Sequence, residues 1–189
     1  MQAGTVLEGR SERPFFMEQI GILHINGERK EKTMSILYMM VGVPGAGKTT
    51  YAKKKLSYMH YIGTDQIRKE LWGTEKRVFR GYSLVHGIME RRLIKKLISG
   101  RDVVLDCSNT TRRKRKKILD VLPEDIGVIA IYLDTNLETI LQNNRNRSRH
   151  VPPIGIIFMY LTRQKPLKEE GFLKVVTIRK ASIRKAAFC

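Results

Sequence analysis

The chain has 189 residues, of which 42% are apolar and 29% charged, a composition typical of one folded domain that can bury a core. Its longest apolar run, residues 154–161, is far shorter than the roughly 20 residues of a membrane span, and two cysteines provide no disulfide framework. The net charge is +18; a field of that sign attracts polyanions, nucleic acid first, although a basic protein without a polymeric partner is the plainer alternative.

Residues 1–33 hold five basic and five acidic residues, so the whole positive excess lies in residues 34–189. This first segment shows no clear hydrophobic period and lacks the long apolar stretch of a secretory signal. We therefore expect an N-terminal extension outside the core fold, a core domain over 34–180, and a basic tail over 181–189. The low cysteine content favours a reducing cytoplasm.

The most informative stretch reads GVPGAGKT over residues 42–49, between an apolar run at 36–41 and a helix-compatible run. Glycines let the chain turn with positive φ and let a phosphate approach the backbone, and the amides at the following helix N-terminus attract the anion. Lys48 is expected to reach the β- and γ-phosphates, and the Thr49 hydroxyl to bind magnesium. The sequence thus predicts a nucleoside triphosphate site, with ATP and Mg²⁺ as cofactors. Its nucleotide-binding residues are Gly42, Gly45, Ala46, Gly47, Lys48, Thr49 and Thr50.

Strand and helix patterns alternate after this loop, which predicts an α/β fold with three layers and a five-stranded parallel sheet. The strands are expected at 36–41, 58–62, 102–106, 127–133 and 173–178. The helices are expected to run from the loop to about residue 56, then at 65–72, 78–99, 111–122, 136–147 and 154–163. There is no internal repeat.

Two carboxylates stand where ligands collect in open α/β sheets. Asp106 ends an apolar strand and is expected to hold magnesium beside Thr49, unless it only caps a turn. Asp65 begins a helix, and Arg68 shares its face three residues later. We expect Asp65 to accept the proton of an attacking hydroxyl and Arg68 to bind a substrate phosphate; helix capping is the plainer role.

Arginines alternate at 145, 147 and 149, just before Pro152. Such a segment suits a lid over the phosphates, with Arg147 the first choice for neutralising charge on the transferring group, although a solvated helix end has the same composition. The run at 112–117 consists of six cations that cannot all face one way on a helix. Part of it must be solvated, and contact with a phosphate backbone is an open alternative.

Taken together, several segments resemble the kinase domain of polynucleotide 5′-hydroxyl kinases, within the small P-loop kinase proteins often described as AAA-type ATPases. The similarity covers about 36–178. The segments that carry it are residues 42–50, 64–71, 103–109, the Asn144/Arg147/Val151-Pro152 element and 170–172.

This resemblance implies that Asp65 is the general base and that Arg68 contacts the phosphate of the acceptor. It implies that Lys48 and Thr49 serve ATP and magnesium and that Arg147 serves the transferring phosphoryl group. One departure concerns the lid, where the family usually has Arg-Asn and this chain has Asn143-Asn144. Arg145 or Arg149 is a candidate substitute.

The expected function is therefore transfer of the γ-phosphoryl group of ATP to a hydroxyl, preferably the 5′-OH of DNA or RNA. One alternative is a kinase of a nucleoside, sugar or antibiotic on the same fold. Another is a nucleic-acid-binding ATPase that phosphorylates nothing.

Overall fold

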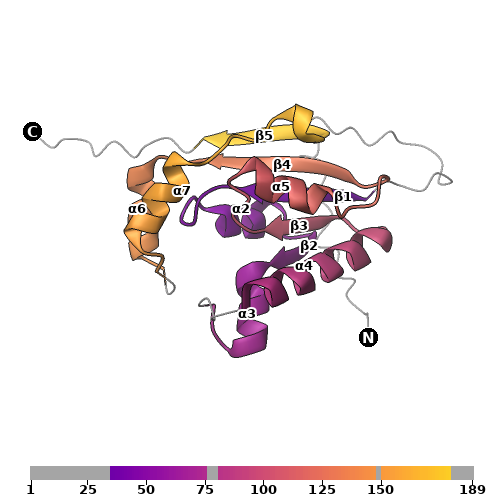
Figure 1. Ribbon diagram of the computed structural model, residues 1–189, viewed down its shortest axis with the longest axis horizontal. Coiled ribbons are helices and arrows are strands. Elements are labelled where there is room, and N and C mark those ends of the chain that lie inside the picture. The colour runs from indigo at the N-terminus through magenta and orange to yellow at the C-terminus, as the bar shows by residue number, and fades with distance from the viewer. Residues whose placement is uncertain (1–34, 76–80, 148–149, 180–189) are drawn as a thin grey trace, which may run out of the picture.

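The computed structural model describes residues 35–75, 81–147 and 150–179. The predicted extension over 1–33, the predicted tail over 181–189 and Arg149 lie outside the described residues. Five parallel strands form one sheet in the order β2-β3-β1-β4-β5, which confirms the predicted fold class (Figure 1). The strands are β1 Ile36–Val41, β2 His60–Gly63, β3 Val103–Asp106, β4 Gly127–Asp134 and β5 Lys174–Arg179.

Six α-helices and one short 3-10 helix connect the strands within the described residues. The helices are α2 Lys48–Lys55, α3 Thr64–Trp72, α4 Gly81–Ile98, α5 Arg112–Leu119, α6 Leu137–Arg145, α7 Pro153–Leu161 and the 3-10 helix η1 Lys168–Glu170. The sequence did not predict η1. In the described ranges, no helix combines the length and the apolar character that crossing a bilayer requires.

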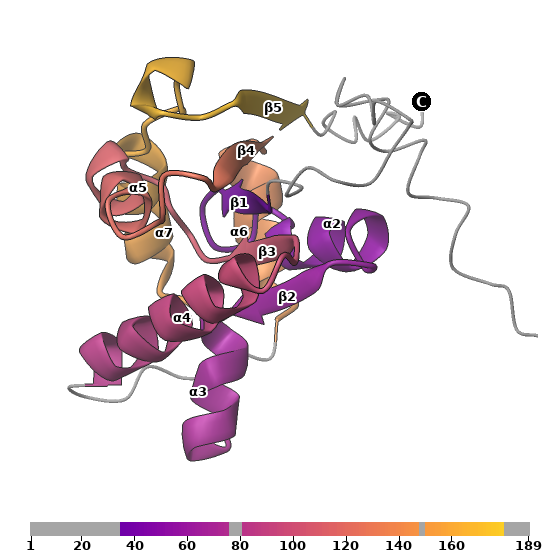
Figure 2. The ribbon, with the colours of Figure 1, turned by 90° about the vertical axis from the view of Figure 1, so that its right-hand side faces the viewer.

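The sheet is buried on both faces, as a parallel sheet must be (Figure 2). Alternate residues of β1 point to opposite sides: Leu37 and Met39 join one core, and Tyr38 and Met40 join the other. The first core includes buried residues of α4 and α5, and the second includes buried residues of α2, α6 and α7. Two helix layers thus enclose the sheet, which gives the predicted three layers.

Element boundaries differ from the predictions by a few residues. The helix expected over 111–122 ends at Leu119, because the next turn tightens before Pro123. There the amides of Val121 and Leu122 donate to carbonyls three residues back, and a residue before proline avoids the helical region. The strand expected over 58–62 is displaced to 60–63, in register with β3.

The carboxyl ends of β1, β2 and β3 meet at one edge of the sheet. Leu105 pairs with Met39, and Asp106 pairs with Gly63, directly before α3. The loop after β1, the start of α3 and the end of β3 are therefore brought together by strand register alone. This edge is where the sequence placed its candidate residues.

Candidate active site

The loop between β1 and α2 has the backbone conformation that its glycines predict. Gly45 and Gly47 have φ values of 91° and 95°, in the left-handed region. A Cβ at Gly45 would lie 2.7 Å from the carbonyl oxygen of Ile140, so no larger residue fits there. Gly47 caps α2 without a side-chain hydrogen bond to the first turn of the helix. Those first amides are the kind that bind an anion.

Lys48 is the first residue of α2, and its side chain turns back toward the loop. Its Nζ atom donates to the carbonyl oxygens of Gly42 at 2.9 Å and Val43 at 3.1 Å. Burial lowers the pKa of Lys48 and nearby Arg147 lowers it further, while Asp106 opposes both, and the balance is a lowered pKa. The loop thus holds a desolvated cation beside uncapped amides, a combination that fits the phosphates of a nucleotide.

Asp106 collects two hydroxyl groups at the end of β3. Its Oδ2 atom accepts from the Thr49 hydroxyl at 2.5 Å and from the Tyr61 hydroxyl at 2.7 Å. A carboxylate and a hydroxyl oxygen at this spacing are hard ligands of the kind that Mg²⁺ prefers when nucleotide phosphates supply the rest. Thr49 and Asp106 therefore fit a magnesium ion that accompanies a nucleotide.

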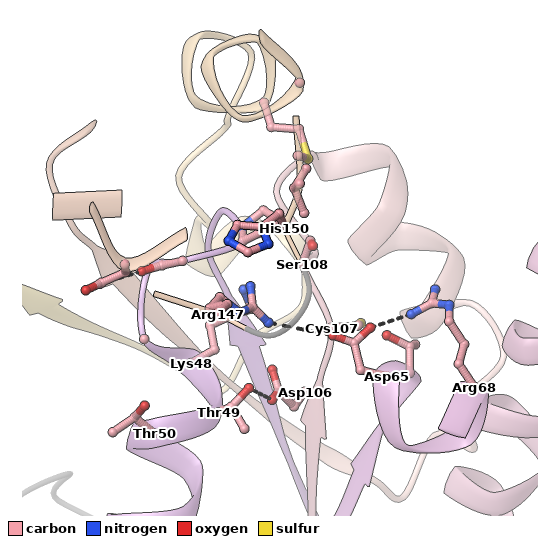
Figure 3. A pocket seen from close by; sticks show the side chains of 18 of the residues that line it. Lys48, Thr49, Thr50, Asp65, Arg68, Asp106, Cys107, Ser108, Arg147 and His150 are labelled. Carbon is pink, nitrogen blue, oxygen red and sulfur yellow. Dashed lines mark hydrogen bonds and ion pairs between the residues drawn. The ribbon is translucent and has the colours of Figure 1, made fainter. Parts of the chain in front are cut away.

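Asp65 stands across from these groups, between two arginines (Figure 3). Its Oδ1 atom accepts from Arg68 Nη1 at 2.5 Å, and its Oδ2 atom lies 3.8 Å from Arg147 Nη2. Arg68 is buried, whereas the side chains of Asp65 and Arg147 are 35% and 32% exposed. The cluster joins the start of α3 to the residues that follow α6 and faces solvent.

A cleft of about 860 Å³ contains both groups of side chains. The predicted residues that line it are Gly45, Gly47, Lys48, Thr49, Thr50, Asp65, Arg68, Asp106 and Arg147. Gly42 and Ala46 do not line it. The Gly42 carbonyl holds Lys48, and Ala46 is buried with its amide donating to Val43. These two residues therefore stabilise the loop conformation without lining the cleft.

The lid segment is the stretch 143–152, and its described residues Asn143, Arg147 and 150–152 line the cleft. Asn143, the departure from the family pattern, donates from Nδ2 to the Gly45 carbonyl at 2.8 Å and so contacts the loop directly. Buried Asn144 donates to the Val151 carbonyl and accepts from the Val151 amide, which joins the two ends of the segment. Arg145 is exposed and does not line the cleft. Arg147 is thus the described lid arginine that reaches it.

Sequence reasoning missed Tyr61, which lies in β2 and reaches Asp106 across Gly63. A Cβ at Gly63 would lie 2.7 Å from the Tyr61 hydroxyl, so this glycine leaves room for the tyrosine. Burial, and after it the Asp106 carboxylate, raises the pKa of Tyr61. The hydroxyl therefore stays protonated at neutral pH and donates its hydrogen bond to Asp106. The sequence signal that could have indicated this contact is a glycine, Gly63, two residues after Tyr61 on the same face of the strand.

Cys107 also lines the cleft and was not singled out. Burial first, and then neighbouring Asp106, raises the pKa of its thiol to about 12. The thiol donates to Asn109 Oδ1 at 2.9 Å. A thiol with this pKa stays protonated at neutral pH, which makes it a weak nucleophile.

Arg115, within the basic run at 112–117, is completely buried and does not face solvent. Its Nε and Nη2 atoms donate to the two carboxylate oxygens of Glu170 at 2.8 and 2.7 Å. Burial alone would raise the pKa of Glu170, but hydrogen bonds from Arg115 and the Leu167 amide outweigh it, so the pKa is lowered. Arg115, one of the six cations in this run, therefore stabilises the fold through its ion pair with Glu170.

Comparison with known proteins agrees with this architecture. A family model described as an AAA domain matches residues 37–153, which is more than half of the chain. The match includes the loop, both carboxylates and the whole lid segment.

Solved structures share the fold at low identity. A chain of the Pnkp1/Rnl/Hen1 RNA repair complex is 17% identical with a TM-score of 0.62, over 72% of this chain and 46% of that one. A sugar kinase from Janibacter sp. HTCC2649 is 19% identical with a TM-score of 0.54, over 77% and 85%. Shikimate kinase from Acinetobacter baumannii is 20% identical with a TM-score of 0.53, over 79% and 87%. The present chain thus spans less than half of the first of these proteins.

Proposed function

The chain belongs to the AAA domain family, and from that premise and the cleft geometry we propose that it is an ATP-dependent kinase that phosphorylates a hydroxyl group. The preferred acceptor is the 5′-OH of a DNA or RNA strand. The observation that carries the proposal is the position of Asp65, between two arginines and in the same cleft as Lys48 and Asp106.

In this proposal each side of the cleft has its own task. The loop amides and Lys48 bind the phosphates of ATP, and Thr49 and Asp106 hold Mg²⁺. When bound, ATP supplies the phosphoryl group and Mg²⁺ offsets part of its charge. Tyr61 keeps the Asp106 carboxylate oriented through the 2.7 Å hydrogen bond.

Asp65 accepts the proton of the attacking hydroxyl as the new O–P bond forms and the bond between the γ-phosphorus and the oxygen that leaves with ADP breaks. Arg68 binds the phosphate next to that hydroxyl, an interaction that a polynucleotide end offers and a free sugar does not. Arg147 stabilises the negative charge on the transferring group. Asn143 holds the Gly45 carbonyl and keeps the lid segment against the loop.

A polynucleotide acceptor is supported by Arg68, by the net charge of +18 and by the similarity to the RNA repair complex. A small-molecule acceptor is the second candidate. The observation that favours it is the similar length of the small-molecule kinases. The chain covers 85% of the sugar kinase and 87% of the shikimate kinase, but only 46% of the repair-complex chain.

The test is an acceptor panel with γ-labelled ATP and Mg²⁺. We expect label at the 5′ end of 5′-OH oligonucleotides and none on oligonucleotides that already carry a 5′-phosphate. Label on a sugar or shikimate-like alcohol alone would support the second candidate. ATP hydrolysis stimulated by nucleic acid with no labelled acceptor would mean a nucleic-acid-dependent ATPase, and would overturn both.

We also propose that residues 34–180 form the kinase domain, that residues 1–33 are an extension outside it and that residues 181–189 form a basic tail. A cytoplasmic location suits a protein that uses ATP and keeps a buried free thiol at Cys107. A chain that begins at Met34 should fold and bind ATP as the full chain does. Loss of either property would place residues 1–33 in the functional unit.

A further inference from the structure

A second cavity of about 370 Å³ lies beside the candidate active site. It borders β2, the outer strand of the sheet, whose position Figure 1 shows. We call it the edge hollow. Its floor is β2 residues 60–63, one end is formed by Gln66 and Ile67 at the start of α3, and one side by Arg92, Lys95 and Lys96 of α4. The first two turns of α3 thus have residues facing each cavity, with Asp65 and Arg68 in the cleft and Gln66 and Ile67 in the hollow.

The rim of the edge hollow is strongly cationic. Arg92 is paired with Glu70 at 2.6 Å. Lys95 and Lys96, by contrast, form no ion pair within the described part of the chain. The Arg101 guanidinium lies 2.9 Å from His60, whose pKa is lowered first by burial and then by the cations Lys96 and Arg101. A ligand of this rim should therefore carry negative charge.

The edge hollow adjoins the candidate active site at one residue, Tyr61, which lines both cavities. From there β2 leads away from Gly63, beside the cleft, to His60 at the other end of the strand. Ile62 and Ile67 belong to the buried core, so the groups that the hollow offers to a ligand are mainly the cations of α4. A small anion would use only part of such a surface, whereas a chain of linked phosphates and sugars matches all of it.

We propose that the edge hollow binds the backbone of a single-stranded polynucleotide acceptor beyond its terminal nucleotide. This inference rests on the proposed function. Lys95 and Lys96, with Arg92 beside them, neutralise backbone phosphates. A recess between one strand and two helices admits one nucleic acid strand more readily than a duplex.

Direct binding tests the proposal without catalysis. The full chain is titrated, in the absence of ATP, against a fluorescent single-stranded 12-mer with a free 5′-OH, and anisotropy is recorded at several salt concentrations. The double variant Lys95→Ala/Lys96→Ala should bind about 10–30-fold more weakly at 0.1 M salt, and the slope of log K against log salt should become shallower by about 1.4.

The matched control is Arg113→Ala/Lys117→Ala, which removes two exposed cations from α5. It changes the net charge equally but leaves the edge hollow intact, so its affinity should fall less than threefold. Equal losses in both double variants would show that only the overall field matters and would overturn the proposal. Unchanged affinity in the α4 variant would also overturn it.

Transfer kinetics separate this proposal from the proposed function. The α4 double variant should show a KM about tenfold higher for the 12-mer, with kcat and the KM for a 5′-OH dinucleotide unchanged. If the wild-type chain labels neither acceptor while the binding results hold, the proposed function fails and the hollow remains a nucleic acid surface. If both acceptors are labelled and the variant matches the wild type, the hollow fails and the proposed function stands.

Discussion

Two arginine–carboxylate clusters in this molecule share the same chemistry but have different surroundings. In the first, the side chains of Arg115 and Glu170 are 0% and 3% exposed and form two hydrogen bonds, while Arg115 Nη1 donates to two backbone carbonyls. In the second, Asp65 accepts closely from Arg68, but Arg147 stays 3.8 Å away and about a third exposed.

The difference shows what each cluster can do. In the first cluster all three guanidinium nitrogens of Arg115 and both carboxylate oxygens of Glu170 bond to protein groups, so this cluster holds α5 and η1 in place. The second faces a cleft, and its arginines can exchange part of their contact with Asp65 for a phosphate. The first should therefore govern stability and the second activity.

The largest effect is expected from Arg147→Ala. If Arg147 stabilises charge on the transferring group, kcat should fall by about 10³–10⁵, while the melting temperature stays within a degree or two of the wild type. Arg145→Ala is the matched control, because Arg145 is exposed and lies outside the cleft. A steady-state transfer assay measures both. Equal losses in the two variants would remove the distinction between lid arginines.

Asp65→Asn should lower kcat by about 10²–10⁴, since a carboxamide cannot accept the proton of the hydroxyl. ATP affinity, measured by calorimetry, should change less than threefold, because Asp65 lies at the start of α3, outside the loop, and asparagine keeps the size of the side chain. The matching change in the other cluster, Glu170→Gln, should leave kcat nearly intact. Transfer that survives Asp65→Asn would assign the base elsewhere.

Glu170→Ala should have the opposite profile, with a loss of about 3–5 kcal/mol in the free energy of unfolding, because it leaves buried Arg115 without its carboxylate. Urea denaturation followed by circular dichroism measures this. Asp65→Ala should cost less than Glu170→Ala, because Asp65 is 35% exposed and Arg147 32% exposed, so water can replace part of the lost contacts. A loss below 1 kcal/mol for Glu170→Ala would mean that the buried cluster does not hold the fold.

A smaller effect is expected on the free energy of unfolding at acidic pH. The pKa of Glu170 is lowered in the folded state, so the stability it contributes is fully present above its ordinary value of 4.5 and is lost as the pH falls through the folded value. Glu170→Gln should therefore flatten the decline of unfolding free energy between pH 5 and the acid limit. Parallel curves for wild type and variant would contradict this assignment.

The sequence predicted the loop side of the cleft well, because its signals are local. Glycines at fixed spacing, Lys48 and Thr49 define one backbone conformation, and Asp106 follows from the end of an apolar strand. The five parallel strands and the helix that contains Asp65 were also predicted from local patterns, and the structure has them; the order of the strands in the sheet was not predicted.

The features that the sequence did not predict depend on contacts between residues far apart in the chain. Arg115 is one cation among six in the sequence, and its partner Glu170 lies 55 residues away. A weak signal existed, since Arg115 is three residues before buried Ile118 and so shares its helix face. The edge hollow, built from β2, α3 and α4, had no signal at all, and the acceptor depends on surfaces of this kind.

The most direct test of the central claim is a crystal structure of the full chain with a non-hydrolysable ATP analogue, Mg²⁺ and a 5′-OH dinucleotide. The account predicts the triphosphate in the loop at residues 42–49, the metal at Thr49 and Asp106, and the acceptor hydroxyl about 2.6–3.2 Å from an Asp65 oxygen. It would be contradicted by a dinucleotide bound with its 5′-OH away from Asp65, or by a lid segment that keeps Arg147 paired with Asp65 and closes the acceptor side.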